Sequence, residues 1–237
     1  MKIEDYVKNK LNKNIDLKYK EFTKNLCDTS YHTLGVRLPI LRSISKEVAL
    51  SKEFLANDKE EYMKIQKNDT FEEVMIKGFL IEYVKEFEFD KKLKLFENFI
   101  PYIDNWSVCD SVITTLKFIK KDRKKVWKFL DKYFKSEKEF YLRAAIVVSM
   151  DYFIVDEYID LVLDKYKEIV LKDYYVKMAL AWSLSMIYIN YKEKVLDFLN
   201  SNNLDNFTHN KSIQKMIESY KVSEEDKNYL KRLKKKG

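Results

Sequence analysis

Two side chains in the middle of the sequence have the types and the spacing to form a small reactive site. Pro101 and the pair Asp104–Asn105 predict a helix start, with one of the two polar residues as its N-cap. Such a helix places Trp106 and Asp110 four residues apart on one face. Asp110 is then an acid among apolar neighbours, and a carboxylate there would stabilise a developing positive charge. The same spacing also fits a purely structural helix, whose dipole favours an acid in the second turn while the tryptophan packs in the core.

Two further residues follow at a similar interval. Arg143 lies 37 residues after Trp106, and Trp182 lies 39 residues after Arg143. In a helical repeat, residues one repeat apart occupy similar heights on adjacent helices, so we expect this pair to converge with the first on one concave surface. Indole faces attract cations, and a guanidinium binds phosphate through two hydrogen bonds. The cluster therefore suits an alkylated purine in DNA, which combines a cationic aromatic ring with nearby phosphates.

Most other catalytic arrangements are missing from the sequence. It contains no glycine-rich phosphate loop, and its cysteines and histidines do not have metal-ligand spacing. His32 and His209 are the only histidines, and we expect both to be ordinary surface or capping residues. We therefore expect no metal and no organic cofactor, and any catalysis is expected to depend on a carboxylate.

The elements that must position these residues are helices. Only 3 Gly and 2 Pro occur in 237 residues, which argues against a β-sandwich or a barrel. Hydrophobic residues make up 46% of the chain, enough for a sizeable core. Apolar residues recur at helical spacing, for example in the stripe Tyr175, Met178, Ala179, Trp182 and Met186.

The long helices also recur with a fixed period. We expect them to start near Arg37, Phe71, Trp106, Leu142 and Tyr175, at intervals of 34, 35, 36 and 33 residues. This period is typical of helix pairs that stack into a solenoid. We predict an all-α fold, a right-handed α-solenoid of HEAT-like helix pairs (an alpha-alpha superhelix). Because no linker interrupts the chain, we expect a single domain over 1–237. A bundle of antiparallel helices has a similar rhythm and remains an alternative.

Five segments of the chain carry a further signal. They are LGVRLPILR (34–42), DNWSVCD (104–110), LRAAIV (142–147), YYVKMALAW (174–182) and HNKSIQK (209–215). In this order and at this spacing, they resemble the AlkD-like DNA alkylation repair family. The resemblance implies a HEAT-like repeat DNA glycosylase that excises positively charged N3- or N7-alkylated purines from double-stranded DNA by hydrolysing the N-glycosidic bond.

The resemblance also implies roles for individual residues. Asp110 matches the catalytic carboxylate, Trp106 and Trp182 match tryptophans that pack against the deoxyribose of the lesion, and Arg143 matches an arginine that holds the DNA backbone. Unlike most enzymes that act on bases, the family does not need to turn the damaged base into a pocket.

Basic residues at both ends of the chain are expected to contact DNA. Arg37 and Arg42 lie in the first matching segment, and Lys211 and Lys215 lie one helical turn apart in the last. The net charge is +7, and residues 211–237 hold 9 basic and 4 acidic side chains, so we predict a basic helical segment there. Such a segment attracts phosphates, although a merely solvated tail would have the same composition.

Two positions depart from the family's pattern. Ser185 stands where its best-known enzymes carry a basic residue three places after the second tryptophan, so one phosphate contact is expected to be missing. Leu26 stands where those enzymes place an aromatic side chain at the lesion, and Tyr31 is the nearest aromatic residue. A non-catalytic HEAT-repeat protein that recognises distorted or branched DNA is the alternative function, and a scaffold for other proteins is a third.

The compartment follows from the cysteines and the N-terminus. Cys27 and Cys109 cannot staple a fold of this size, so a reducing cytoplasm is expected. The first residues include acids where a signal peptide would be apolar, and no uncharged stretch is long enough to span a membrane. We expect a cytoplasmic monomer without membrane contact that associates with the nucleoid when bound to DNA.

Overall fold

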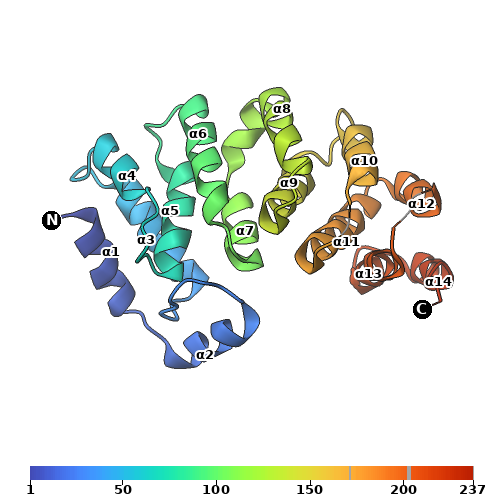
Figure 1. Cartoon of the computed structure of the whole chain (residues 1–237), viewed down its shortest axis with the longest axis horizontal. Helices are drawn as coiled ribbons and strands as arrows, with labels where there is room; N and C mark the ends of the chain where they lie inside the picture. Colours follow the sequence, from blue (N-terminus) through green and yellow to red (C-terminus); the bar gives the residue numbers. More distant parts are fainter. Residues whose placement is uncertain (171, 202–203, 237) are drawn as a thin grey trace. The chain divides into compact units, whose positions relative to one another are not determined.

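The computed structural model of the chain describes residues 1–170, 172–201 and 204–236. These residues form α-helices and two short 3₁₀ helices, and their only β-type pairing is an isolated bridge between His32 and Thr70 (Figure 1). The prediction of an all-α fold is confirmed. None of the helices in these ranges combines the length and the apolar character needed to cross a membrane.

Contacts within the chain gather in two compact units, each described by itself. No linker rich in Gly, Ser or Pro marks the boundary between them. The expectation of a single domain over 1–237 stays a prediction. The first unit, Met1–Asp122, contains α1 (Ile3–Asn12), α2 (Leu17–Leu26), α3 (Leu38–Leu50), α4 (Ala56–Tyr62), α5 (Phe71–Tyr83), α6 (Phe89–Phe99), η1 (Ile100–Tyr102), α7 (Trp106–Ile113) and η2 (Lys117–Lys121).

The second unit, Arg123–Gly237, contains the remaining helices. Its last residue, Gly237, which also ends the predicted basic segment 211–237, lies outside the described residues. The helices are α8 (Arg123–Phe134), α9 (Glu139–Tyr152), α10 (Ile159–Glu168), α11 (Tyr174–Tyr188), α12 (Lys192–Ser201), α13 (Asn206–Glu218) and α14 (Glu224–Arg232).

The long helices recur as the sequence predicts. The helices α3, α5, α7, α9 and α11 begin at residues 38, 71, 106, 139 and 174, each within three residues of its expected start. In the first unit α3 packs on α5, and α5 packs on α6 and α7; in the second unit α11 packs on α9, α12 and α13. This order is consistent with stacked HEAT-like helix pairs.

The helix α5 is the centre of the first unit. Every residue from Phe71 to Ile81 is buried, since α3, α6 and α7 cover it from different sides. Because these positions are buried, the charged side chains among them form hydrogen bonds or ion pairs with other residues of the unit. Glu73 forms a capping box with Thr70, and Lys77 forms an ion pair of 2.5 Å with Asp69.

A buried carboxylate fixes the segment between α2 and α3. Glu72 accepts hydrogen bonds from the backbone N–H groups of residues 34–36 at 2.7–3.2 Å. Gly35, in the middle of this turn, has a φ of +94°, and a Cβ there would lie 2.6 Å from the Lys20 side chain and 2.7 Å from the Asp16 carbonyl. Only glycine satisfies both the backbone conformation and the close approach of α2.

A second glycine allows α7 to approach α5. Gly78 faces Val112, and a Cβ built on it would lie only 2.5 Å from Cγ2 of that valine and 2.9 Å from Cζ of Phe99. Because the two backbones come this close, the position of α7 in the first unit depends on the absence of a side chain at residue 78.

The helix α11 is oriented differently from what its apolar pattern suggests. Of the predicted stripe, Tyr175, Met178 and Trp182 are only partly buried and Met186 is exposed, whereas Ala179 is buried. Ala179 belongs to the fully packed side of α11, which also contains Val176, Leu180, Leu184 and Ile187. The larger side chains therefore line the less covered side of the helix, because small and branched side chains fill the tight contacts with α9 and α13.

Candidate functional site

The start of α7 is built by two adjacent polar residues with different tasks. Asn105 is the N-cap, and its side-chain oxygen accepts a hydrogen bond from the Val108 N–H at 3.0 Å. Asp104 instead anchors the segment that follows α2, because its carboxylate accepts hydrogen bonds from Thr29 Oγ1 at 2.9 Å and from the Ser30 N–H at 2.7 Å. The predicted helix start is confirmed, and the capping residue is Asn105.

Trp106 and Asp110 lie on the outer side of α7. The other side of the helix is buried against α5 through Val108, Cys109, Val112 and Ile113. Trp106 and Asp110 are partly exposed, one turn apart, and Thr114 continues the same side one turn later and is exposed. The interpretation in which the tryptophan is simply a core residue is therefore wrong.

The indole of Trp106 is oriented by the end of α2. Its Nε1–H donates to the Leu26 carbonyl at 3.3 Å, so Leu26, the position that departs from the family's pattern, lies directly beside the tryptophan. Leu26 is 47% exposed, and Phe22, one turn earlier, is 58% exposed. Tyr31 does not take the place of the missing aromatic residue, since its hydroxyl donates a hydrogen bond to the Tyr102 carbonyl. Burial raises the pKa of Tyr31 to about 12. Phe22 is thus the exposed aromatic neighbour, which sequence reasoning missed because its exposure depends on how α2 docks.

In the second unit, Arg143 joins two long helices. Its side chain is 4% exposed, and its Nη1 donates to the Tyr175 carbonyl at 2.6 Å. The Tyr175 N–H in turn donates to Glu139 Oε1 at 2.8 Å. Arg143 and Glu139, one turn apart on α9, therefore hold both backbone groups of the second residue of α11. The contact of Arg143 with a DNA backbone stays a prediction.

Trp182 lies on the half-covered side of α11, in the stripe described above. Ser185, which replaces the family's basic residue, is buried, and its hydroxyl donates to the Trp182 carbonyl at 2.6 Å. Trp106 and Asp110 thus belong to the first unit, and Arg143 and Trp182 to the second. The convergence of the four side chains on one surface stays a prediction.

The two arginines expected to contact DNA have aromatic neighbours. Arg37 is exposed, forms an ion pair of 2.8 Å with Asp16 and lies 4.7 Å from the ring centre of Tyr19. Arg42 is half-buried and lies 5.4 Å from the ring centre of Phe79. Both guanidinium groups are therefore held in place, the first by α2 and the second by α5.

The predicted basic segment 211–237 comprises most of α13, a turn and α14. Lys211 and Lys215 follow one another on α13, and both are partly buried. His209 differs from its expected surface role. It is 4% exposed because the C-terminal residues cover it, and its Nε2 lies 2.9 Å from the Leu233 carbonyl. Burial lowers the pKa of this histidine.

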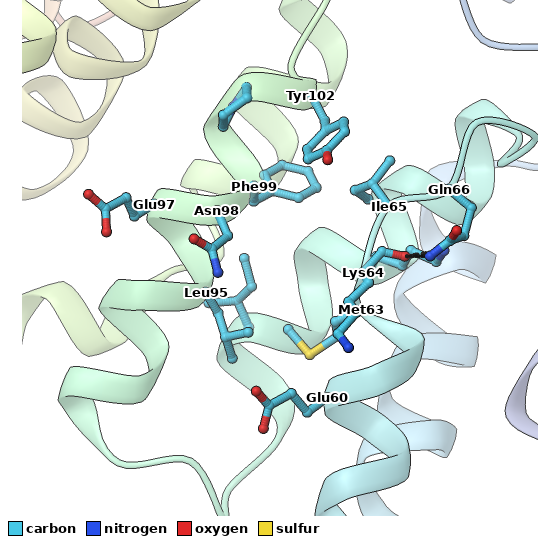
Figure 2. Close-up of a pocket in the computed structure, with 13 residues that line it drawn as sticks. Glu60, Met63, Lys64, Ile65, Gln66, Leu95, Glu97, Asn98, Phe99 and Tyr102 are labelled. Carbon is cyan, nitrogen blue, oxygen red and sulfur yellow. Dashed lines mark hydrogen bonds between the residues drawn. The ribbon is translucent and has the colours of Figure 1, made fainter.

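A cavity of about 590 Å³ lies beside α6 in the first unit and contains none of the predicted site residues. Figure 2 shows Met63, Ile65 and Phe99 around the hollow, with the carboxylate of Glu60 at one end. Its charged groups are already committed to internal pairs, Glu60 with Lys91 and Lys77 with Asp69. In the part of the chain that the structure describes, no three His, Cys, Asp or Glu side chains are placed to hold a metal ion together.

Comparison with known proteins identifies the family. A comparison with curated protein sequences finds no match. The model of the family described as DNA alkylation repair enzyme matches residues 7–218. This range covers the helices α7, α9, α11 and α13, and it contains every predicted site residue. The chain therefore belongs to the DNA alkylation repair enzyme family.

Proposed function

We propose that this protein is a DNA glycosylase that excises positively charged N3- or N7-alkylated purines from double-stranded DNA. The observation that carries the proposal is the partly exposed carboxylate of Asp110 one turn from the indole of Trp106, on the outer side of α7, in a chain of the DNA alkylation repair family. A monomer without metal or organic cofactor suffices, because the reaction requires only water.

The reaction would proceed through a positively charged sugar. The C1′–N bond breaks with both electrons going to the base, which leaves as a neutral purine because alkylation had made it cationic. The carboxylate of Asp110 stabilises the oxocarbenium-like sugar and orients a water molecule. The water oxygen bonds to C1′, and its proton passes through the carboxylate to solvent. A neutral purine is a poorer leaving group and would gain far less from this site.

The remaining residues would bind and orient the lesion. In this proposal Trp106 and Trp182 pack against the deoxyribose, and their ring faces add favourable interactions with the developing cation. Arg143 holds the DNA backbone beside the lesion, while its hydrogen bond to the Tyr175 carbonyl keeps α11 in register with α9. Leu26 and Phe22 continue the apolar surface next to Trp106 and would lie along the neighbouring nucleotides.

The test is the release of N7-methylguanine and N3-methyladenine from methylated double-stranded DNA. The wild-type protein should release both bases, and Asp110→Asn should release them at least about 100-fold more slowly, since removal of one electrostatic group of this kind costs about 10²–10³ in rate. Asp5→Asn is the matched control, because it makes the same chemical change at an exposed acid of α1 and should leave the rate unchanged.

Binding measured in parallel separates the two functions. Asp110→Asn should still bind the duplex, because the carboxylate contributes nothing to phosphate attraction. A wild-type protein that binds methylated duplex DNA but releases neither base would contradict the glycosylase proposal and favour a non-catalytic DNA-binding protein.

A further inference from the structure

A cleft of about 890 Å³ opens in the first unit between the middle of α3 and the ends of α5 and α7. Its wall has six basic side chains and two acidic ones. The basic residues are Arg42, Lys46, Lys85, Lys92, Lys117 and Lys121, and the acidic ones are Glu82 and Glu88. We call this hollow the cationic cleft.

Five of the six cations of this cleft have no carboxylate partner among the described residues, in contrast to several buried or bridging lysines of the same unit. Lys10, Lys59 and Lys77 each form an ion pair with a carboxylate at 2.5–2.7 Å. Within the described ranges, no carboxylate lies at ion-pair distance from any of five cleft residues, namely Arg42, Lys46, Lys85, Lys117 and Lys121. Like charges that converge without counterions repel one another, and an anionic ligand would relieve this repulsion.

One of the two acidic residues of the cleft, Glu82, is held by contacts within the fold. One carboxylate oxygen of Glu82 accepts a hydrogen bond from the Phe118 N–H at 3.0 Å. The buried ammonium group of Lys92 donates to the Glu82 backbone carbonyl at 2.5 Å and so caps the last turn of α5. Burial lowers the pKa of Lys92. Lys92 is therefore buried in the cleft wall, whereas the other lysines are exposed and form the mouth of the cleft, namely Lys46, Lys85, Lys117 and Lys121.

Aromatic rings orient two of the cations. Arg42 lies 5.4 Å from the ring centre of Phe79, and Lys46, one turn later on α3, lies 5.5 Å from the ring centre of Tyr83. The rings themselves follow one another along α5. The two cation–π pairs therefore hold the side chains of α3 along one wall of the cleft at low cost in side-chain entropy.

The cationic cleft adjoins the outer side of α7. Thr114 lines the cleft and stands one turn after Asp110 on the same side of the helix. One turn of four residues rises about 6 Å, and successive nucleotides of one DNA strand are about 3.4 Å apart along the duplex axis. For a DNA strand that runs along α7, the cleft begins about two nucleotides from the sugar that Asp110 would contact.

We propose that the cationic cleft binds phosphate groups of the bound DNA, within about two or three nucleotides of the lesion. The register of this contact rests on the proposed function, because it is counted from Asp110. The contact compensates for the family's basic residue that is absent at Ser185, and it anchors the DNA on the first unit independently of the sequence of bases.

The first test removes two exposed cations from the mouth of the cleft. Lys117→Ala with Lys121→Ala should weaken binding of an undamaged duplex by about tenfold or more at about 0.1 M salt. The slope of log K against log salt should become less steep by about 2, close to 0.9 for each lost phosphate contact. Lys52→Ala with Lys67→Ala removes two exposed lysines of the same unit that do not line the cleft, and serves as the control. Equal affinities and slopes for the two double variants would overturn the proposal.

The second test locates the contact and separates it from the glycosylase reaction. Neutral methylphosphonate linkages placed two or three nucleotides from the lesion should weaken binding by the wild-type protein but not by the cleft variant. Equal effects on both proteins would overturn the assigned register. Base release by the wild type is scored separately, so loss of the proposed function and loss of this contact are distinct results. If the cleft variant loses affinity for inorganic tripolyphosphate but keeps full affinity for DNA, the cleft serves a free anion and the proposal is wrong.

Discussion

Replacing Gly78 with alanine is expected to separate α7 from α5. The new Cβ would lie 2.5 Å from Val112 Cγ2 and 2.9 Å from Phe99 Cζ, whereas ordinary contacts of a Cβ lie at 3.4–4 Å. One of the two helices must therefore shift by about 1 Å, because both neighbours are buried and packed on their far sides. Trp106 and Asp110 move with α7, so the substitution changes the site as well as the core.

The size of the effect follows from two opposing contributions. Overpacking of a core typically costs about 1–3 kcal/mol, and alanine in a helix interior is about 1 kcal/mol more favourable than glycine. The 2.5 Å contact with Val112 places this site in the upper part of the first range, about 2–3 kcal/mol, so we expect a net loss of about 1–2 kcal/mol in the free energy of unfolding. For a chain of this length, such a loss lowers Tm by about 2–8 °C.

The assay is thermal unfolding of a double-mutant cycle with Val112→Ala, which removes the two methyl groups that the new Cβ would meet. The combined variant should be more stable than the sum of the single effects predicts, by about 1 kcal/mol or more. If Gly78→Ala melts at or above the wild-type temperature, or if the two changes are simply additive, the proposed close contact between α5 and α7 is refuted.

Three further predictions concern stability and pH. Glu72→Gln should lower the free energy of unfolding by about 2 kcal/mol, because the backbone around Gly35 loses its charged acceptor; an unchanged urea midpoint would contradict this. Burial lowers the pKa of His209, so its contribution to stability is present above the unfolded pKa of about 6.5 and is lost as the pH falls through the lower folded value. Protonation would place a hydrogen on Nδ1, which is buried without a partner. Wild-type Tm should therefore fall more steeply than that of His209→Gln between neutral and mildly acidic pH, and parallel curves would argue against the burial of His209 by the C-terminal residues. The folded pKa of Tyr31 is about 12, above its ordinary value of 10.0, so its contribution is present below pH 10 and is lost as the pH rises through the folded value. The ring resonance of Tyr31 in an NMR titration should move near pH 12, and a midpoint near 10 would contradict the partial burial of its hydroxyl.

The helices could be predicted from local patterns because local physics determines them. The scarcity of glycine and proline, the apolar period and the polar pair before Trp106 were sufficient to place the starts of five helices within three residues. The choice between Asp104 and Asn105 as the cap was not a local matter. Asp104 is used by Thr29 and Ser30, which only the folded chain brings to it.

The orientation of the helices could not be read from the same patterns. The stripe that contains Trp182 has the spacing of a core face, yet α9 and α13 pack against smaller residues of α11 and leave that stripe partly exposed. His209 has a polar sequence context, yet the C-terminal residues bury it. In each case, exposure is determined by segments far away in the sequence.

Local patterns in the chain were enough to predict the all-α class, the helix starts and the family resemblance, because helix formation and motif spacing depend on neighbouring residues. The same patterns singled out the candidate residues Trp106, Asp110, Arg143 and Trp182. Two features became visible only in the folded chain: Asp110 lies on the outer side of α7, and unpaired lysines from three segments line one cleft. Exposure and the pairing of charges depend on which side chains meet across the fold, and that information is not contained in any local stretch of sequence.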